Sequence, residues 1–213
     1  MVLLALLSLM MFWDMAKENV SPALEGQWPW RFELLAPEAL SNLLAVSLGF
    51  VFARAQYART VRPIIGWSGR VSAGSHAMHS KHVWVIEIRN GGMHSAILES
   101  ADYCVQPKGE HIPAADVPWQ GYEATVSGLE SLGLQIGKDF DLNPIGPGSP
   151  LVVSGSGHGL YTARLSVPAI SLLDNLYIRI RVIDAVGDTH ERILHCLRGA
   201  EVEMRSALAT DEP

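Results

Sequence analysis

The sequence contains few charged residues and few cysteines. Of its 213 residues 18% are charged, the formal net charge is −6, and two residues are cysteines. The acidic balance excludes a basic protein that binds a nucleic-acid duplex, and 48% hydrophobic residues exclude a disordered chain. Two distant cysteines make neither a disulfide framework nor a zinc knuckle. The sequence is therefore that of a folded chain, and its apolar residues concentrate near its start.

Two long apolar stretches lie in the first quarter of the chain. Residues 1–13 carry no charge, and residues 39–53 are the uninterrupted part of a second stretch that runs from 34 to 53. In the second stretch apolar residues occupy all sides of the helix, which favours lipid over a soluble core. We therefore predict a transmembrane helical hairpin over residues 1–60, with the lipid bilayer as a partner. A signal peptide is the alternative for the first stretch, although a positively charged start and a cleavage site are missing.

Basic residues predict the orientation of this hairpin. Arg54, Arg59 and Arg62 follow the second stretch with no acidic residue among them, whereas acidic residues outnumber basic ones in the loop between the stretches. Positive residues next to a membrane helix stay in the cytoplasm. We expect an inner-membrane protein whose C-terminal domain is cytoplasmic.

Residues 61–200 alternate between apolar and polar residues with a period of two. Residues 82–89 place Trp84, Ile86 and Ile88 on one face and Glu87 and Arg89 on the other, so that Glu87 should face solvent if that face is solvated. Further strands are predicted at residues 61–71, 95–105, 123–126, 151–154, 160–167, 176–183 and 190–197, with a short helix near residues 128–136 and a polar tail at residues 201–213. This pattern predicts a mainly β fold, either an antiparallel β-sandwich or a small β-barrel.

Four loose motifs extend over most of the chain. They are Thr60-Val61-Arg62-Pro63, the turn Asn90-Gly91-Gly92 with Ala96 opening the next strand, the loop Pro147-Gly148-Ser149-Pro150, and the turn Asp184 to Gly187 between the last two strands. In these motifs the chain resembles uncharacterised bacterial membrane-anchored proteins that carry N-terminal transmembrane helices and an immunoglobulin-like β-sandwich. The resemblance implies that fold and a cytoplasmic placement, and it implies no activity.

Three histidines at intervals of three, His76, His79 and His82, form the most unusual local pattern. Imidazoles at this spacing can gather on a transition metal in a tight loop, but no carboxylate or thiol is close in sequence to complete the set. A polar loop between two strands is the favoured interpretation. The sequence also lacks a nucleophile elbow and the lysine of a phosphate-binding loop, so we predict neither an enzyme nor a cofactor.

Cys104 and Cys196 each lie within a predicted strand. A bridge between facing strands is one interpretation, and two free, buried thiols are the other, favoured because the cytoplasm is reducing. Trp84 is the best candidate for the centre of the core, while Trp67 and Trp119 are expected to pack in the core or on a sheet.

Three functional hypotheses follow from these patterns. The first is a membrane-anchored, non-catalytic protein whose cytoplasmic sandwich binds another protein or self-associates. The second is a ligand-gated membrane effector that senses a small anion such as a cyclic nucleotide through Arg164, Arg179 and Arg181, of which the last two share a strand face. The third, and weakest, is a metal-dependent enzyme built on the histidine loop.

Overall fold

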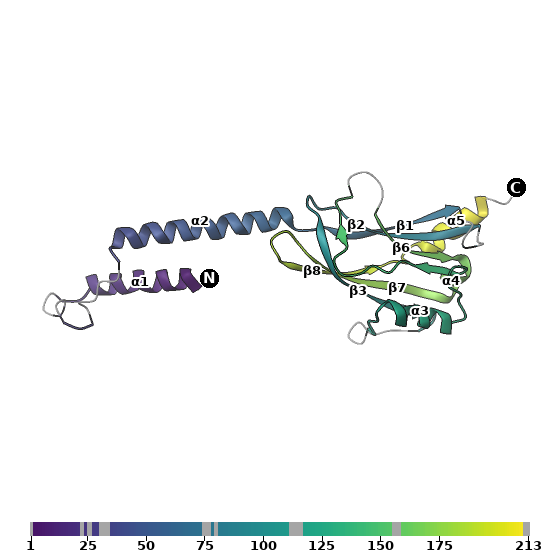
Figure 1. Ribbon diagram of the computed structural model, residues 1–213, viewed down its shortest axis with the longest axis horizontal. Coiled ribbons are helices and arrows are strands. Elements are labelled where there is room, and N and C mark those ends of the chain that lie inside the picture. Colours follow the sequence, from purple (N-terminus) through teal and green to yellow (C-terminus); the bar gives the residue numbers. More distant parts are fainter. Residues whose placement is uncertain are drawn as a thin grey trace. The chain divides into compact units, whose positions relative to one another are not determined.

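A computed structural model describes residues 2–21, 24, 27–29, 35–73, 78, 81–110, 117–154 and 159–210. The chain divides into two compact units, Met1–Thr60 and Val61–Pro213. The first unit is helical and the second is built on β-sheets (Figure 1). We refer to the second unit as the β domain.

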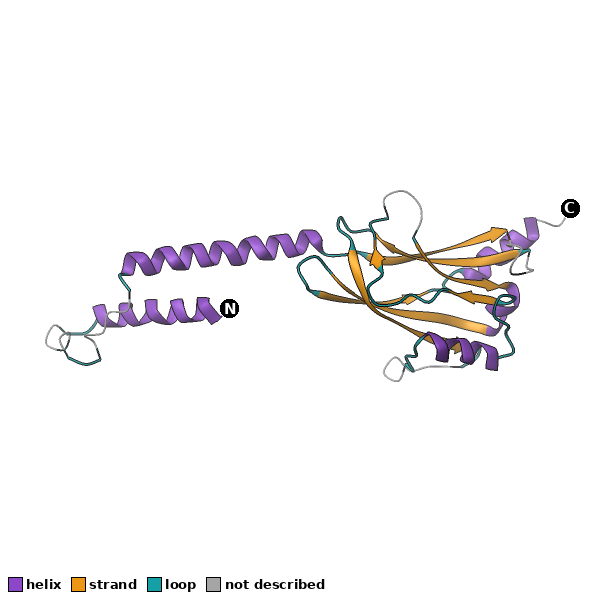
Figure 2. Cartoon of the chain, viewed as in Figure 1, coloured by secondary structure: helices purple, strands orange, loops and turns teal. Residues whose placement is uncertain are grey.

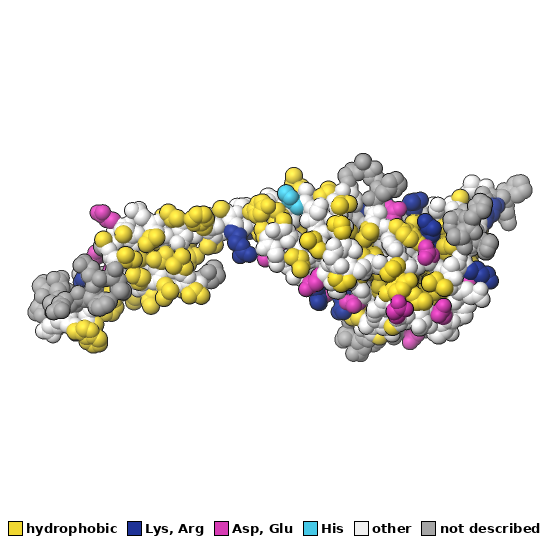
Figure 3. Space-filling view, viewed as in Figure 1, with side chains coloured by type: hydrophobic (Ala, Val, Ile, Leu, Met, Phe, Trp, Pro, Cys, Tyr) yellow, Lys and Arg dark blue, Asp and Glu magenta, His cyan; other side chains and the backbone are white. Residues whose placement is uncertain are grey.

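The first unit is a hairpin of two helices, α1 (Val2–Glu18) and α2 (Pro37–Val61). Hydrophobic side chains make up much of the visible surface of the two helices (Figure 3). Among the described residues, one helix is long and apolar enough to cross a membrane, Glu38–Val61, with a mean hydropathy of 1.3 and few buried side chains. The helical hairpin predicted from the sequence is confirmed. The 17 residues of α1 extend only about 25 Å, less than a hydrocarbon core of about 30 Å, so its crossing remains a prediction.

The β domain contains two four-stranded antiparallel sheets, one of them a half-barrel (Figure 2). Sheet A consists, in order, of β1 (Ile65–Ala73), β2 (His82–Asn90), β6 (Leu160–Ser166) and β4 (Phe140–Leu142). Sheet B consists, in order, of β5 (Pro150–Leu151), β3 (Ala96–Pro107), β7 (Leu173–Ile183) and β8 (Thr189–His195). The antiparallel sheets expected from the period-two pattern are thus present.

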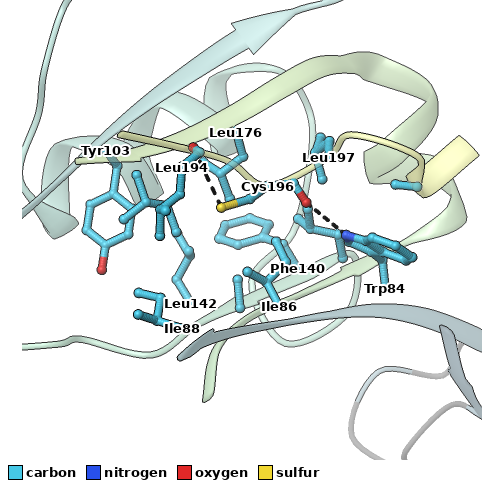
Figure 4. Packing of buried hydrophobic residues seen from close by; sticks show 14 of the residues in the cluster. Trp84, Ile86, Ile88, Tyr103, Phe140, Leu142, Leu176, Leu194, Cys196 and Leu197 are labelled. Carbon is cyan, nitrogen blue, oxygen red and sulfur yellow. Dashed lines mark hydrogen bonds between the residues drawn. The ribbon is translucent and has the colours of Figure 1, made fainter. Parts of the chain in front are cut away.

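The apolar faces of the strands together form a single core between the sheets. Trp84, Ile86 and Ile88 of β2 are at most 3% exposed, as the alternation predicts. They meet alternate residues of β7 and residues from β3, β4 and the segment after β8 (Figure 4). The indole N–H of Trp84 donates to the backbone carbonyl of Cys196 at 3.0 Å, which satisfies the one polar group of the ring. Cys196 lies in this core and Cys104 on the outer face of sheet B, and both are free thiols.

The turn predicted between the last two strands is also present. Asp184 accepts hydrogen bonds through Oδ1 from the backbone N–H groups of Val186 and Asp188, at 2.9 and 3.0 Å. Gly187 adopts φ 84°, a left-handed conformation that glycine tolerates without steric cost. The Asp-x-x-Gly pattern therefore fixes this connection by local chemistry.

Helices are more extensive than the sequence predicts, so the chain is mixed α/β rather than mainly β. Residues 123–126, predicted as a strand, belong to α3 (Tyr122–Ser131), because Thr125 and Leu129 become buried on one helical face. Two further helices are α4 (Val167–Leu172), whose first turn is capped by the Ser166 hydroxyl, and α5 (Ala200–Thr210). Helix α5 occupies most of the segment expected as a polar tail, and its Met204 packs in the core.

The face of β2 opposite Trp84 is buried, whereas the alternation suggests that it is solvated. Val83, Val85 and Glu87 are at most 5% exposed. Met78 and Tyr161 cover the two valines. Contacts from other segments of the chain therefore bury both faces of this strand, which alternation within β2 alone does not reveal.

Candidate functional site

The outer face of sheet B carries two of the arginines singled out in the sequence. Arg179 and Arg181 alternate along β7 and project from the same face, as predicted. Arg179 donates from Nε and Nη2 to Oδ2 of Asp102, at 3.1 and 2.8 Å. Arg181 donates to Glu191 at 2.8 Å, and this contact raises the pKa of the Arg181 guanidinium. Each positive charge on this face is therefore balanced by a carboxylate on a neighbouring strand.

Trp119 lies over Arg179 on the same face. The guanidinium carbon of Arg179 is 4.8 Å from the centre of the indole ring, a cation–π arrangement. The carboxylate of Asp102 accepts hydrogen bonds along the edge of the guanidinium while Trp119 lies against its face, so the stacked geometry is fixed in advance of any contact with a partner. Asp102 and Arg179 remain about a quarter exposed, at 29% and 27%.

Tyr177 extends this cluster along β7. Its ring packs edge-on against the imidazole of His195, with centroids 4.8 Å apart and planes at 73°. Its hydroxyl donates to Oε1 of Gln106 at 3.0 Å. Ile193, which pairs with Arg179 in register, is 44% exposed. We call Asp102, Trp119, Tyr177, Arg179 and Ile193 the Trp119 surface.

The Trp119 surface combines side-chain types that are common at protein interfaces. Tryptophan, tyrosine and arginine are the side chains that contribute most at protein interfaces, because they bury a large area and retain a polar group. A sheet face with prepaired charges offers such groups in fixed positions. Asp102 and Arg179 are already bonded to one another and the Tyr177 hydroxyl is bonded to Gln106, and such preorganisation lowers the ordering cost of binding.

Arg164, the third predicted arginine, lies on the other sheet. Its guanidinium carbon is 4.7 Å from the ring centre of Tyr161, and it pairs in register with Asp141 and Val85 on the outer face of sheet A. The hydroxyl of Tyr161 donates to Asp141. Burial and the neighbouring carboxylate raise the pKa of Tyr161. The structure therefore brings Arg179 and Arg181 together and places Arg164 elsewhere, and the described space between the sheets is apolar.

Glu87 is the centre of a second polar group on the outer face of sheet A. Its carboxylate accepts hydrogen bonds from Arg70 at 3.2 Å, Arg89 at 3.3 Å and the backbone N–H of Gly159 at 3.2 Å. Burial alone would raise the pKa of Glu87, but the Gly159 amide and the two guanidinium groups outweigh it and lower that pKa. Glu87 thereby joins β1 and β2 to the segment that leads into β6.

The metal site that the histidine spacing would allow lies largely outside the described residues. His76 and His79 lie outside the described residues, and His82 is the first residue of β2. Within the described part of the chain there is no group of three histidine, cysteine, aspartate or glutamate side chains with metal-binding geometry.

An open depression of about 250 Å³ lies at the end of the β domain where β7 begins. It is lined by Leu173, Asp174, Val202 and their neighbours, and an ion pair between Lys108 and Glu201 lies at its edge. Because its charged groups are exposed, and Lys108 and Glu201 pair with each other, the depression presents no set of convergent groups for a ligand.

Sequence reasoning did not identify Trp119 and Asp102 as part of a surface. Trp119 was expected to pack in the core or on a sheet, and it packs on the outer face of one. Alternation along β3 is enough to place Asp102 on the same strand face as Cys104 and Gln106. Its pairing with Arg179 depends on the register of β3 and β7, which the sequence does not give. The comparisons found no family model, no curated protein and no solved structure that matches this chain.

Proposed function

We propose that this chain is a membrane-anchored, non-catalytic protein whose β domain binds another protein through the Trp119 surface. The observation that carries this proposal is the stack of Trp119 on Arg179, held in place by Asp102. The stack joins two side chains typical of binding hot spots, and it lies beside the exposed Ile193.

The membrane anchor in this proposal is α2. The length of Glu38–Val61 and its exposed apolar side chains support a membrane span. Arg54 and Arg59 near its end and Arg62 just after it favour a cytoplasmic β domain. The proposed location is the inner membrane of a bacterial cell, with the Trp119 surface available to cytoplasmic proteins.

The strand order supports an immunoglobulin-like sandwich as the form of the β domain. If β1, β2, β3, β6, β7 and β8 take the places of strands A, B, C, E, F and G, sheet A has the order A-B-E-D and sheet B the order C′-C-F-G. The chain departs from the pattern in strand sequence, because the strand in the D position, β4, precedes the strand in the C′ position, β5. The disulfide between strands B and F of antibody domains is also absent, since both described cysteines are free.

The proposal is tested by photo-crosslinking in cells that make the protein. A photoreactive amino acid at Ile193 reports on the Trp119 surface, and one at Ile136, which is similarly exposed at 47% but lies outside this surface, is the matched control. We expect one discrete crosslinked product at position 193, absent at position 136 and lost when Trp119→Ala or Arg179→Ala is added. The same products at both positions, or none at position 193, would contradict the proposal.

A further inference from the structure

The end of the β domain where β1 begins exposes several apolar side chains that the core does not use. Ile64 is 66% exposed, Met93 80%, Val152 59% and Val153 38%. Ile64 precedes β1, Met93 lies in the connection from β2 to β3, and the two valines follow β5. We call these four residues the apolar rim.

Asn90 holds the segments of the apolar rim together. This residue is fully buried, and its Oδ1 accepts hydrogen bonds from the backbone N–H groups of Ile64 at 3.3 Å and Gly92 at 3.0 Å. Its Nδ2 donates to the carbonyls of His94 at 2.8 Å and Leu151 at 3.1 Å. The backbone segments that carry the exposed apolar residues are therefore held together at one end of the β domain.

The rim is uncharged as well as apolar. Residues 63–66, 90–97 and 150–154, which carry it, contain no lysine, arginine, aspartate or glutamate. Soluble surfaces normally intersperse charges among apolar residues. An uncharged apolar surface of this kind marks a contact with another molecule or with a membrane.

The short link between α2 and β1 indicates whether another molecule or the membrane covers the rim. Helix α2 ends at Val61, and Ile64 follows after only two intervening residues. Tyr57, the kind of residue that prefers the headgroup boundary, lies one helical turn before Val61. The turn rises about 6 Å and the link to Ile64 extends at most about 11 Å, so Ile64 lies within about 17 Å of the level of Tyr57.

We infer that the apolar rim rests on the cytoplasmic surface of the bilayer that α2 crosses. This inference depends on the membrane anchor of the proposed function. Arg59 and Arg62 are placed by the same connection to meet anionic headgroups, which complements the apolar contact of the rim.

The test uses the full chain in vesicles of phosphatidylcholine and phosphatidylglycerol. A nitroxide label is attached at Met93→Cys, and the control is Val202→Cys, an apolar residue of similar exposure, 71%, on α5. Val202 lines the depression at the start of β7. The other end of β7 pairs with β3 near the rim, and the 11 residues of β7 extend over about 33 Å. Background labelling is measured on the unsubstituted chain and should be slow, because Cys104 and Cys196 are buried.

The measured quantity is the ratio of label accessibility to oxygen and to a water-soluble nickel chelate. We expect this ratio to be several-fold higher at position 93 than at position 202, and to fall toward the control when Val152→Asp and Val153→Asp are added. A label at position 93 that is as accessible to nickel as the control overturns the inference while the anchor stands. Spin–spin broadening at position 93 would show that a second copy covers the rim, and also overturns it. Failure of the chain to float with the vesicles overturns both the inference and the anchor.

Discussion

The indole ring of Trp84 lies against Gly69 of the neighbouring strand so closely that a Cβ atom at position 69 would be 1.9 Å from Cζ2 of the ring. The ring cannot move away freely, because its N–H is bonded to the carbonyl of Cys196. Gly69 is therefore required for space rather than for backbone conformation.

We expect Gly69→Ala to destabilise the protein by about 1–3 kcal/mol, the usual cost of overpacking a core. Trp84→Ala should cost about 3–5 kcal/mol through the cavity it leaves. When Trp84→Ala is already present, Gly69→Ala should cost less than about 1 kcal/mol, because the clash is gone. Urea unfolding of the full chain in detergent, followed by circular dichroism, measures all three values. Gly66→Ala on the same strand is the control, since nothing lies within 4 Å of its added Cβ atom, and equal effects of the two glycine variants would contradict the clash.

The burial of Glu87 predicts that stability depends on pH. Because its pKa in the folded protein lies below the ordinary value of 4.5, the ionised carboxylate stabilises the fold above that pH, and this contribution is lost as the pH falls through the lowered pKa. Glu87→Gln should lower the free energy of unfolding at pH 7 by about 1–3 kcal/mol, since Arg70 and Arg89 lose a charged partner. The difference from the unsubstituted protein should shrink below pH 4.5, and a difference that stays constant with pH would exclude this role.

Asn90 should be sensitive to the loss of its donor group. Asn90→Asp keeps the size of the side chain but turns an acceptor toward the carbonyls of His94 and Leu151, so we expect a loss of at least about 2 kcal/mol in unfolding free energy at pH 7. Asn175→Asp is the matched control, because Oδ1 of Asn175 accepts from the Leu197 N–H and a carboxylate can do the same. Thermal unfolding of both variants tests the prediction, which a similar loss at the two positions would refute.

The orientation in the membrane should depend on the arginines near the end of α2. A reporter fused after Pro213 should behave as cytoplasmic, and replacing Arg54, Arg59 and Arg62 by glutamine should increase the fraction of chains with the opposite orientation. Paired reporters, one active only inside and one only outside, measure this fraction. An external C-terminus in the unsubstituted chain would reverse the proposed topology.

The sequence by itself determined the strands whose pattern is local. The alternation in residues 82–89 and 176–183 identified β2 and β7 and the residues that face the core, because side chains on a strand alternate with a period of two wherever the strand lies. The Asp-x-x-Gly turn and the helix of residues 39–53 were likewise predictable, since each depends on neighbouring residues.

Only the tertiary structure decided what covers each face. Alternation places Glu87 opposite Trp84, but its burial depends on Arg70 and on Gly159, which is 72 residues away in sequence. Residues 123–126 alternate as a strand would, yet burial of Thr125 and Leu129 on one side makes them helical. Asp102 meets Arg179 only because β3 and β7 pair in one register. Trp119 lies over Arg179 because the next residue, Gln120, pairs with Tyr103 of β3. A local pattern specifies which residues share a face, whereas the partner of that face is selected by the free energy of packing segments distant in sequence.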